Sequence, residues 1–338
     1  MESLPVLSFL IAGQLRRDYL ITNNNKYFLD IPGGNLLYAA AGLGVWERDA
    51  GLIGRVGTDY PEEWLEKATR FGFDRRGVRV LLDSLDLRSF TAYADPDIRL
   101  VDNPVIQFAR RGLPFPKSLL GFTNSPSQLD SKTQPTTTTI RLKDVPQDYL
   151  DATAAHLCPL DFLSHTLLPS SLRQGHISTI TLDPAPGYMN PVFWDEIPKI
   201  LNGINAFITN EEKLSNLFQG RSSDVWEMAE MLGNTGCEII LIKRGARGQF
   251  LYSQANHTRW MIPAYPAHCN NPTGAGDAFC GGFLAGYRKT YDPIEACLYG
   301  SISASIVIEG NGPFFALDAL PGLANARLEA FRNVPRKV

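Results

Sequence analysis

Short apolar runs alternate with helix-like stretches along most of this 338-residue sequence, and this alternation is the feature that most constrains the fold. Runs that are apolar throughout, and not only at every second position, are typical of strands buried on both faces. Such strands separated by helices predict a parallel sheet covered by helices on both sides. We therefore expect an α/β layered architecture, with residues 1–338 forming one domain.

The expected strands are Val6–Ala12, Ala50–Val56, Ala154–Leu157, Ser178–Leu182, Ala206–Thr209, Glu238–Lys243 and Gln249–Ser253. The expected helices are Gly34–Glu47, Pro61–Phe71, Pro191–Leu201, Glu211–Phe218, Ser223–Leu232, Ala275–Arg288 and Pro293–Ile308.

Two β-like regions have no helix beside them in the sequence, and a third region lacks periodicity. Residues 18–30 contain two short β-like pieces around a turn-prone run of asparagines, and the segment from Val78 to Tyr93 is also β-like. We expect lid elements at about 18–30 and 78–111, paired as a small sheet. Residues 112–144 hold several prolines and a run of threonines. A long stretch of this kind predicts a flexible insertion.

Composition excludes several classes of protein. Lys and Arg total 32 against 35 Asp and Glu, a formal net charge of −3. Proteins that bind nucleic acid usually have an excess of basic residues, and this sequence has none. No segment approaches the roughly 18 apolar residues that cross a membrane, and Val6–Ala12 lacks the basic flank of a signal peptide. The five cysteines form no C-x-x-C pair, which predicts reduced thiols and a cytoplasmic protein.

The most informative segment is residues 271–279, which read N-P-T-G-A-G-D-A-F. Gly274 and Gly276 permit a tight turn, and the small apolar residues that follow are typical of a closely packed helix. A glycine turn at a helix N-terminus presents free N–H groups and a positive dipole end to an anion. A phosphate that is being transferred is such an anion.

Asp277 is unusual for an anion-binding turn, because its carboxylate would repel a phosphate. A base that accepts the proton of an attacking substrate hydroxyl explains it better. The alternative is that Asp277 only caps its helix.

These residues resemble the C-terminal signature T-G-A-G-D-A-F of the ribokinase-like, or PfkB, carbohydrate kinases. Other segments are similar to family motifs in the same order along nearly the whole chain. They are Gly33-Gly34 followed by Ala39-Ala40, V-G-T-D at 56–59, T-N-E-E at 209–212 and K-R-G-A-R-G at 243–248. The resemblance implies a doubly wound, mostly parallel sheet with a small β lid. It also implies ATP as the donor, Mg²⁺, and a hydroxyl of a small sugar, polyol or nucleoside as the acceptor.

By this resemblance, Asp277 is the base, and the backbone amides of Gly274, Ala275 and Gly276 form the anion hole. Substrate-binding positions are implied at Asp18, whose carboxylate suits neighbouring hydroxyls, and at Gly33, Gly34 and Asn35. Each position also has a structural alternative. Asp18 could be a solvated loop aspartate, Gly33 and Gly34 could form the turn that starts a helix, and Asn35 could simply cap that helix. The family often has asparagine where this chain has Tyr38, which favours an acceptor larger or more apolar than ribose.

On the nucleotide side, the resemblance implies that Thr273, Asn210, Lys243, Gly245, Gly248 and Gly310 contact the cofactor. Asn210 and Glu212 are expected to meet Mg²⁺ through water, although their spacing departs from N-x-x-E. Alternatively, Asn210 and Glu212 belong to an ordinary acidic first turn of a helix, and Gly245 and Gly248 form a hairpin turn between two strands. Many relatives have an aspartate where this chain has Asn271, so activation by a monovalent cation is doubtful.

The sequence leaves a second class open, a nucleotide- or sugar-binding protein of the same fold without turnover. A dinucleotide oxidoreductase is disfavoured, because the first strand is followed by G-Q-L-R and not by a glycine fingerprint. Either a monomer or a homodimer is compatible with an exposed lid edge.

Overall fold

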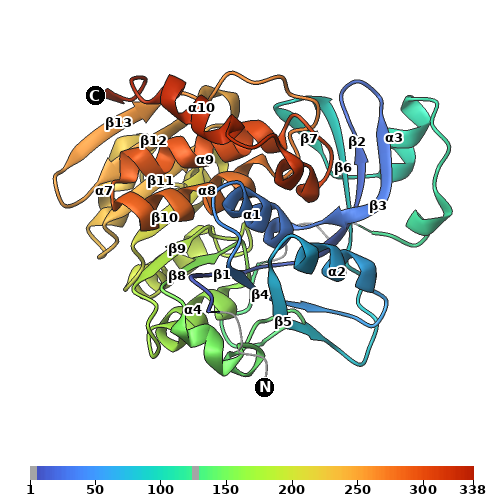
Figure 1. Cartoon of the computed structure of the whole chain (residues 1–338), viewed down its shortest axis with the longest axis horizontal. Helices are drawn as coiled ribbons and strands as arrows, with labels where there is room; N and C mark the ends of the chain where they lie inside the picture. The colour runs from blue at the N-terminus through green and yellow to red at the C-terminus, as the bar shows by residue number, and fades with distance from the viewer. Residues whose placement is uncertain (1–5, 124–128) are drawn as a thin grey trace.

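The computed structural model describes residues 6–123 and 129–338. In this part of the chain, the large sheet has the strand order β14-β13-β12-β11-β10-β9-β8-β1-β4-β5 (Figure 1). Its strands are β1 (Phe9–Ala12), β4 (Ala50–Val56), β5 (Asp74–Val80), β8 (Ala154–Leu157), β9 (Thr179–Leu182), β10 (Ala206–Asn210), β11 (Ile239–Lys243), β12 (Gln249–Ser253), β13 (Thr258–Ile262) and β14 (Arg336–Lys337).

All neighbouring strands from β5 to β11 in this order pair in parallel, whereas β12, β13 and β14 are antiparallel additions. The carboxyl ends of the parallel strands therefore lie along one edge, where ligands bind in open α/β sheets.

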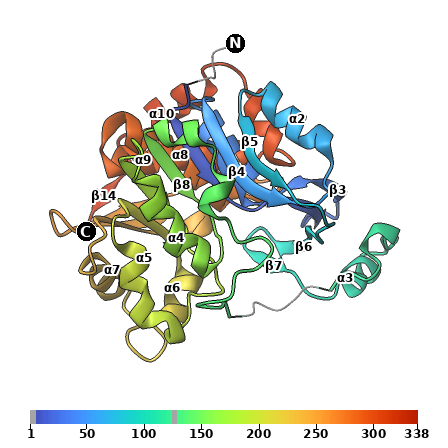
Figure 2. The same cartoon turned by 90° about the horizontal axis from the view of Figure 1, so that it is seen from below.

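Helices cover both faces of the large sheet, as the apolar strands predict (Figures 1 and 2). One layer holds α1 (Asn35–Gly44), α2 (Glu62–Arg70), α8 (Ala275–Thr290), α9 (Pro293–Val307) and α10 (Leu323–Phe331). The other holds α4 (Phe162–Leu172), α5 (Ile197–Leu201), α6 (Glu211–Leu217) and α7 (Val225–Gly233). This arrangement is the predicted doubly wound fold.

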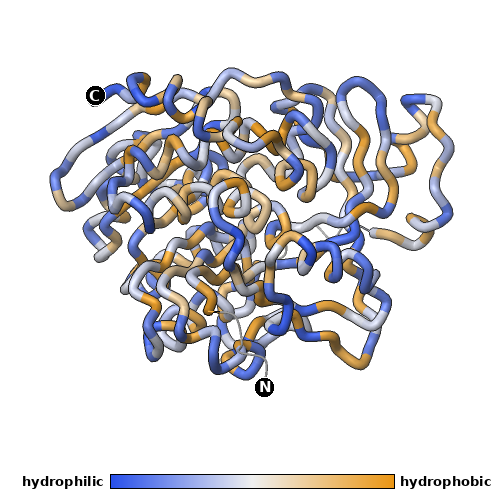
Figure 3. Tube along the Cα trace, in the orientation of Figure 1, coloured by the Kyte–Doolittle hydropathy of each residue, from blue (hydrophilic) through white to orange (hydrophobic). Residues whose placement is uncertain are grey.

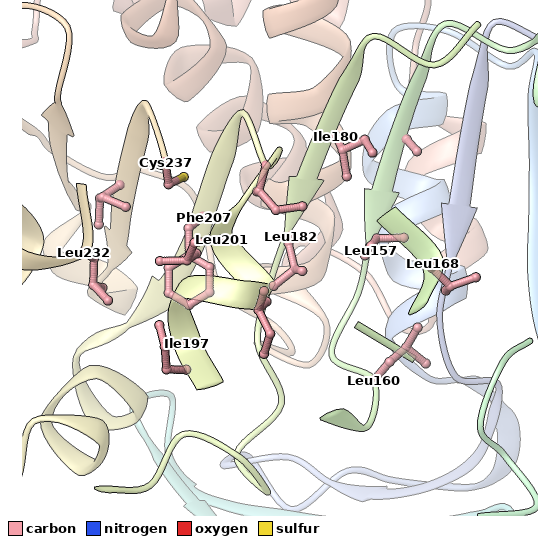
Figure 4. Close-up of a cluster of buried hydrophobic side chains, with 14 of the residues drawn as sticks. Leu157, Leu160, Leu168, Ile180, Leu182, Ile197, Leu201, Phe207, Leu232 and Cys237 are labelled. Carbon is pink, nitrogen blue, oxygen red and sulfur yellow. The ribbon is translucent and has the colours of Figure 1, made fainter. Parts of the chain in front are cut away.

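Apolar side chains fill the space between the sheet and the second helix layer. Figure 4 shows Leu182 and Phe207 from the sheet with Ile197 and Leu201 from α5, all of them buried. Along the chain, apolar segments gather in the interior and polar segments at the outer turns (Figure 3). Burial of this kind stabilises the fold by roughly 1.5–3 kcal/mol for each large side chain.

The small sheet has the order β3-β2-β6-β7 and lies beside the carboxyl edge of the large one (Figure 1). Its strands are β2 (Arg16–Ile21), β3 (Tyr27–Gly33), β6 (Arg88–Asp95) and β7 (Ile98–Leu100), and α3 (Pro104–Arg110) packs on it through Phe108. A second sheet was expected here, but its range differs. Residues 78–80 lie in β5 of the large sheet, because they pair with the end of β4.

Other elements differ from the sequence-based expectations for local reasons. Helix α4 has a proline at position 169 inside it and no clear period, so it was not expected; Asp161 caps it by accepting the Ser164 N–H at 2.7 Å. The predicted helix over 191–201 is a 3₁₀ segment, Pro191–Glu196, followed by the short α5, which begins at Ile197. Described residues of the 112–144 stretch form two 3₁₀ turns, Lys117–Leu119 and Leu142–Asp144.

Candidate active site

The glycine turn opens α8 at the carboxyl edge of the large sheet. Gly274 is the N-cap residue in the left-handed region, with φ 77°, a conformation that suits glycine. The ring of Tyr38 lies against it, so that a Cβ at position 274 would be 2.0 Å from Tyr38 Cδ1. Both constraints require glycine here, which explains the first glycine of the motif.

The first-turn amides differ in their partners. The Ala275 N–H donates to Pro272 O at 3.2 Å, so it serves the turn itself. The N–H groups of Gly276 and Asp277 have no acceptor within residues 6–123 and 129–338. An anion would therefore meet the amides of Gly276 and Asp277 more readily than that of Ala275, which differs in part from the set implied by the resemblance.

Asp277 lies in the first turn of α8 and is only partly exposed. Its carboxylate neither caps the helix nor has a side-chain hydrogen bond to another described residue. Burial raises the pKa of Asp277 to about 6, although the Lys243 cation opposes that rise. A carboxylate that is partly desolvated and free of hydrogen-bonding partners has the properties of a base near neutral pH.

A charged cluster lies beside Asp277, at the carboxyl ends of β9, β10 and β11. Asp183 binds the ammonium groups of Lys213 and Lys243, the second at 2.5 Å, and Lys243 also donates to Gly276 O at 3.2 Å. Burial alone would raise the pKa of Asp183, but the two cations lower it to about 2. Lys243 thus links the cluster to the glycine turn.

Sequence reasoning missed Asp183 and Lys213. Asp183 directly follows an expected strand, and strand ends meet at this edge, which was the available signal. Lys213 stands at the fourth place of the motif that begins at Asn210, where N-x-x-E has its glutamate.

Asp18 of β2 lies over Gly33 and Gly34, on the side of the site that the small sheet forms. Its carboxylate accepts the Ser89 hydroxyl at 2.6 Å and a backbone hydrogen bond from Gly34. A Cβ at Gly33 would be 1.9 Å from Asp18 Oδ2, so glycine is required where the carboxylate turns inward. Burial raises the pKa of Asp18 to about 6, and the Ser89 hydrogen bond and the Arg16 cation restrain that rise.

Tyr38 lies between the two carboxylates. It belongs to α1 and is 2% exposed, yet its hydroxyl has no hydrogen-bond partner in the described chain. Burial raises its pKa, and the charges of Asp18 and Asp277 both add to the effect. A buried hydroxyl without a partner next to two carboxylates is a candidate contact for a polar ligand.

Asn35 has a structural role in this structure. Its Oδ1 accepts the Gln14 N–H at 2.7 Å and its Nδ2 donates to Pro159 O at 2.9 Å. The amide therefore ties the chain after β1 to the chain after β8, and it does not cap α1.

The small sheet reaches the glycine turn through one side-chain contact. The Tyr93 hydroxyl on β6 lies 3.0 Å from Thr273 Oγ1. Because side chains alternate along a strand, Ser89 and Tyr93 share one face of β6, and this face is turned toward the glycine turn. Asp18 of β2 and Asp277 of α8 therefore lie on facing sides of this site.

Three of the predicted nucleotide positions are glycines outside the glycine turn. Gly245 has φ 58° and a Cβ there would be 3.2 Å from Asp97 in the β6–β7 turn. Gly248 has φ 81° and lies against the Ile262 carbonyl. A Cβ at Gly310 would meet the Phe315 ring at 1.9 Å. These positions form backbone turns between β11 and β12 and after α9.

The predicted magnesium residues do not form a ready-made metal site. Asn210 Oδ1 caps α6 by accepting the Lys213 N–H at 2.8 Å, and Glu212 is exposed in the same turn. No group of three or more His, Cys, Asp or Glu residues suited to a metal occurs in the described chain. These donors therefore do not fit a metal held by the protein alone.

Asn271 stabilises the turn that precedes the motif. Its Oδ1 accepts the Thr273 N–H at 3.1 Å, and its own N–H donates to Ile308 O at 3.0 Å. The side chain is 2% exposed and brings no charge to this loop.

Within the described residues, no helix is long and apolar enough to cross a membrane.

Comparison with known proteins agrees with the fold and the motifs. Residues 163–319 match the pfkB family carbohydrate kinase. A cytidine kinase of Thermococcus kodakarensis is 25% identical over 295 residues, which cover 87% of this chain and 92% of the relative. A nucleoside kinase of Methanocaldococcus jannaschii is 30% identical over 132 residues, which cover 38% of this chain and 40% of the relative.

Solved structures show the same fold. A nucleoside kinase of Burkholderia thailandensis in complex with inosine has a TM-score of 0.69 at 19% identity, with 97% of this chain and 99% of that chain covered. A ribokinase II candidate from E. coli, in complex with ATP and Mg²⁺, also has a TM-score of 0.69, at 17% identity and with 96% and 99% covered.

These matches, the sheet topology and the intact T-G-A-G-D motif define the class of protein, a phosphotransferase with an alcohol group as acceptor. Over residues 163–319 its sequence, and over nearly the whole chain its fold, are similar to those of the ribokinase-like, or PfkB, carbohydrate kinases.

Proposed function

We propose that this protein transfers the γ-phosphate of ATP to a hydroxyl of a sugar, polyol or nucleoside, with Asp277 as the base. The observation that carries this proposal is the Asp277 carboxylate itself. It lies at the glycine turn, is partly desolvated, has no hydrogen-bonding partner among the described residues and faces Asp18 of the small sheet. The names of the relatives, cytidine and nucleoside kinases among them, support this class of acceptor.

In the proposed mechanism, Asp18 accepts hydrogen bonds from acceptor hydroxyls and orients the reacting one toward Asp277. Asp277 takes the proton of that hydroxyl as its oxygen forms a bond to the γ-phosphorus and the bond from this phosphorus to the bridging oxygen of ADP breaks. The amides of Gly276 and Asp277 stabilise the charge on the moving phosphoryl group. Orientation supplies much of the remaining acceleration.

We infer that Mg²⁺, where it takes part, arrives with the nucleotide and is held chiefly by phosphate oxygens and water. The described residues support this inference because Lys213 occupies the place of the N-x-x-E glutamate and binds Asp183. The ammonium groups of Lys213 and Lys243 bring positive charge to the same strand ends.

A second candidate function is a nucleotide- or sugar-binding protein without turnover. The replacement of the expected glutamate by Lys213 favours it. Against it, a protein that only binds phosphates has no use for a desolvated carboxylate at the glycine turn.

The test is the Asp277→Asn variant, measured by ADP release across sugars, polyols and nucleosides. Loss of a general base typically costs about 10²–10⁴-fold, so we expect kcat to fall by at least about 100-fold while ATP binding persists. We also expect folding to be unimpaired, because the raised pKa of Asp277 means that its charge destabilises the folded state at neutral pH.

Glu295→Gln is the matched control, since Glu295 lies in the first turn of α9 outside the site. Near wild-type turnover in Asp277→Asn would contradict the role of the base. Tight binding of ATP with no ADP release by the wild type on any acceptor would favour the binding protein.

A further inference from the structure

A cavity outside the candidate active site is lined by four cations and, within the described chain, by no carboxylate. It has a volume of about 380 Å³ and lies between the carboxyl ends of β4 and β5 and a covering segment, residues 135–143. Its charged side chains are those of Arg55, Arg79, Arg141 and Lys143. None of the residues assigned above to the acceptor, the phosphates or the nucleotide lines it, so the mechanism does not use this cavity.

The strand register places two of these cations side by side. Arg55 of β4 and Arg79 of β5 are direct partners in the parallel pair, so their side chains leave the sheet on the same face. Ile53, two residues before Arg55, packs in the core between the sheet and the second helix layer, which identifies that face. Like charges placed directly opposite each other are destabilising, so an anion is needed to offset them.

Asp144 offsets part of this charge, but its oxygens are already engaged. Arg55 Nε and Nη2 donate to them at 2.9 and 3.1 Å, and the Arg141 N–H donates at 2.8 Å. Arg79 Nη1 lies 3.6 Å away. The Asp144 side chain is 0% exposed and lies behind the cavity wall, so one negative charge meets four positive ones and three remain in excess.

The other two cations, Arg141 and Lys143, come from the covering segment. Both are exposed, and neither side chain forms an ion pair with a described residue. Either residue alone would be an ordinary solvated charge. Arg55 makes the difference, because it is 8% exposed and donates to Thr137 O at 3.0 Å, which fixes the covering segment beside the arginines of the sheet.

The lining has the chemistry of a phosphate site. Guanidinium groups bind phosphate oxygens in pairs, and lysine adds a point charge. Thr136 and Thr137 bring hydroxyl groups to the lining, and Leu81 and Pro135 bring apolar surface. The volume is at the lower end of the roughly 300–1,000 Å³ of small-molecule sites, which suits a small molecule that has a phosphate at one end and carbon at the other.

We propose that this cavity binds a small organic phosphate with at least two negative charges, at a site separate from the proposed phosphoryl-transfer site. The phosphate would contact Arg79, Arg141 and Lys143, whose side chains donate no hydrogen bond to a described carboxylate. Its organic part would lie against Leu81 and Pro135. The bound molecule would join β5 to the covering segment. The inference goes beyond the proposed function and does not depend on it.

The test is a calorimetric titration of the full chain with glycerol 3-phosphate, together with thermal unfolding, at constant ionic strength. Glycerol is the neutral counterpart of this probe, and succinate is the dicarboxylate that separates a phosphate site from a site for any dianion. We expect glycerol 3-phosphate to raise Tm by about 3–5 °C at 100 times its Kd. We expect glycerol and succinate to bind at least about 10-fold more weakly.

The variants decide where the probe binds. Arg141→Gln/Lys143→Gln removes two exposed cations, so the fold should persist, and we expect it to weaken binding of glycerol 3-phosphate by about 10- to 100-fold. Arg79→Gln should act in the same direction. The matched control is Arg70→Gln/Lys117→Gln, which removes the same two residue types from exposed positions outside the cavity and should leave the Kd unchanged.

Four outcomes would overturn the inference. No binding of glycerol 3-phosphate would do so, and equal weakening by the two double variants would show a general effect of net charge. Binding that neither Arg79→Gln nor Arg141→Gln/Lys143→Gln changes would place the phosphate elsewhere, and succinate that binds as tightly would refute the assignment to phosphate. Because the readouts are Kd and Tm and not ADP release, a failure of the proposed kinase reaction would leave this test unaffected.

Discussion

At Asp277 two opposing effects act on one carboxylate, and their balance places its titration in the working range of a base. Burial disfavours the charged form, whereas Lys243 favours it; Asp183, Lys213 and Arg99 are the other charges that face it. The resulting pKa of about 6 means that Asp277 is ionised at neutral pH and mostly protonated below pH 6, where it could not act as the proposed base. Asp18 has a raised pKa of about 6 for a related reason.

This pair of carboxylates predicts the pH dependence of the reaction. If both must be ionised in the free enzyme, log kcat/KM falls below pH 6 with a slope that approaches 2. Asp18→Asn should lower kcat/KM and reduce the slope to 1. Lys243 lowers the pKa of Asp277, so Lys243→Met should raise that pKa and move the corresponding fall in kcat/KM to higher pH. The measurement is a pH–rate profile of the three proteins, and a wild-type slope of 1 with a midpoint near 4 would contradict it.

At the scale of the elements, the ends of β9, β10 and β11 are joined by one buried carboxylate. Asp183 is 2% exposed and Lys213 is 8% exposed, so neither charge can rely on water if its partner is removed. The lowered pKa of Asp183 means that this pairing stabilises the fold above pH 4 and is lost as the pH falls toward 2.

We expect Asp183→Asn to lower the free energy of unfolding by about 3 kcal/mol, because it leaves two buried ammonium groups with one neutral amide. The measurement is denaturant unfolding at pH 7. Lys213→Met should cost less, since Asp183 keeps Lys243. The exposed Asp195→Asn is the control and should change stability by less than about 0.5 kcal/mol. A loss in Asp183→Asn as small as in the control would mean that the pairing contributes nothing.

At the scale of the whole molecule, the small sheet is tied to the glycine turn by Tyr93 and Thr273. This contact joins the face that holds Asp18 to the helix that holds Asp277. The site therefore depends on how the two sheets are placed relative to each other.

We expect Tyr93→Phe to lower stability by about 1 kcal/mol, the usual contribution of one neutral hydrogen bond. Hydrogen exchange should quicken in β6 and β7 and stay unchanged in β9 and β10. Tyr149→Phe is the matched control, because Tyr149 donates to Asp74 O beside the large sheet at 2.9 Å. Faster exchange in both sheets of Tyr93→Phe would refute the idea that this contact acts on the small sheet.

The sequence alone determined the layered architecture, because apolar strands and capped helices are local patterns that report burial on two faces. It also located the glycine turn, since the left-handed φ of Gly274 and its contact with Tyr38 admit no other residue. The sequence-based prediction started the second segment of the small sheet too early, at residue 78. Residues 78–80 belong to β5, an edge strand of the large sheet, and such a strand has the same alternation of side chains in either sheet.

Only the tertiary structure decided how the site is composed. The site draws on separate segments, among them those of Asp183, Lys213 and Ser89, and strand order and register bring these segments to one edge. The roles of Asn35 and Asn210 were also decided there, since an amide that caps a helix or ties two loops looks the same in sequence as one that binds a ligand. Burial, which shifts the pKa of Asp18 and Asp277, depends on all the neighbours of a side chain, and no short segment contains that information.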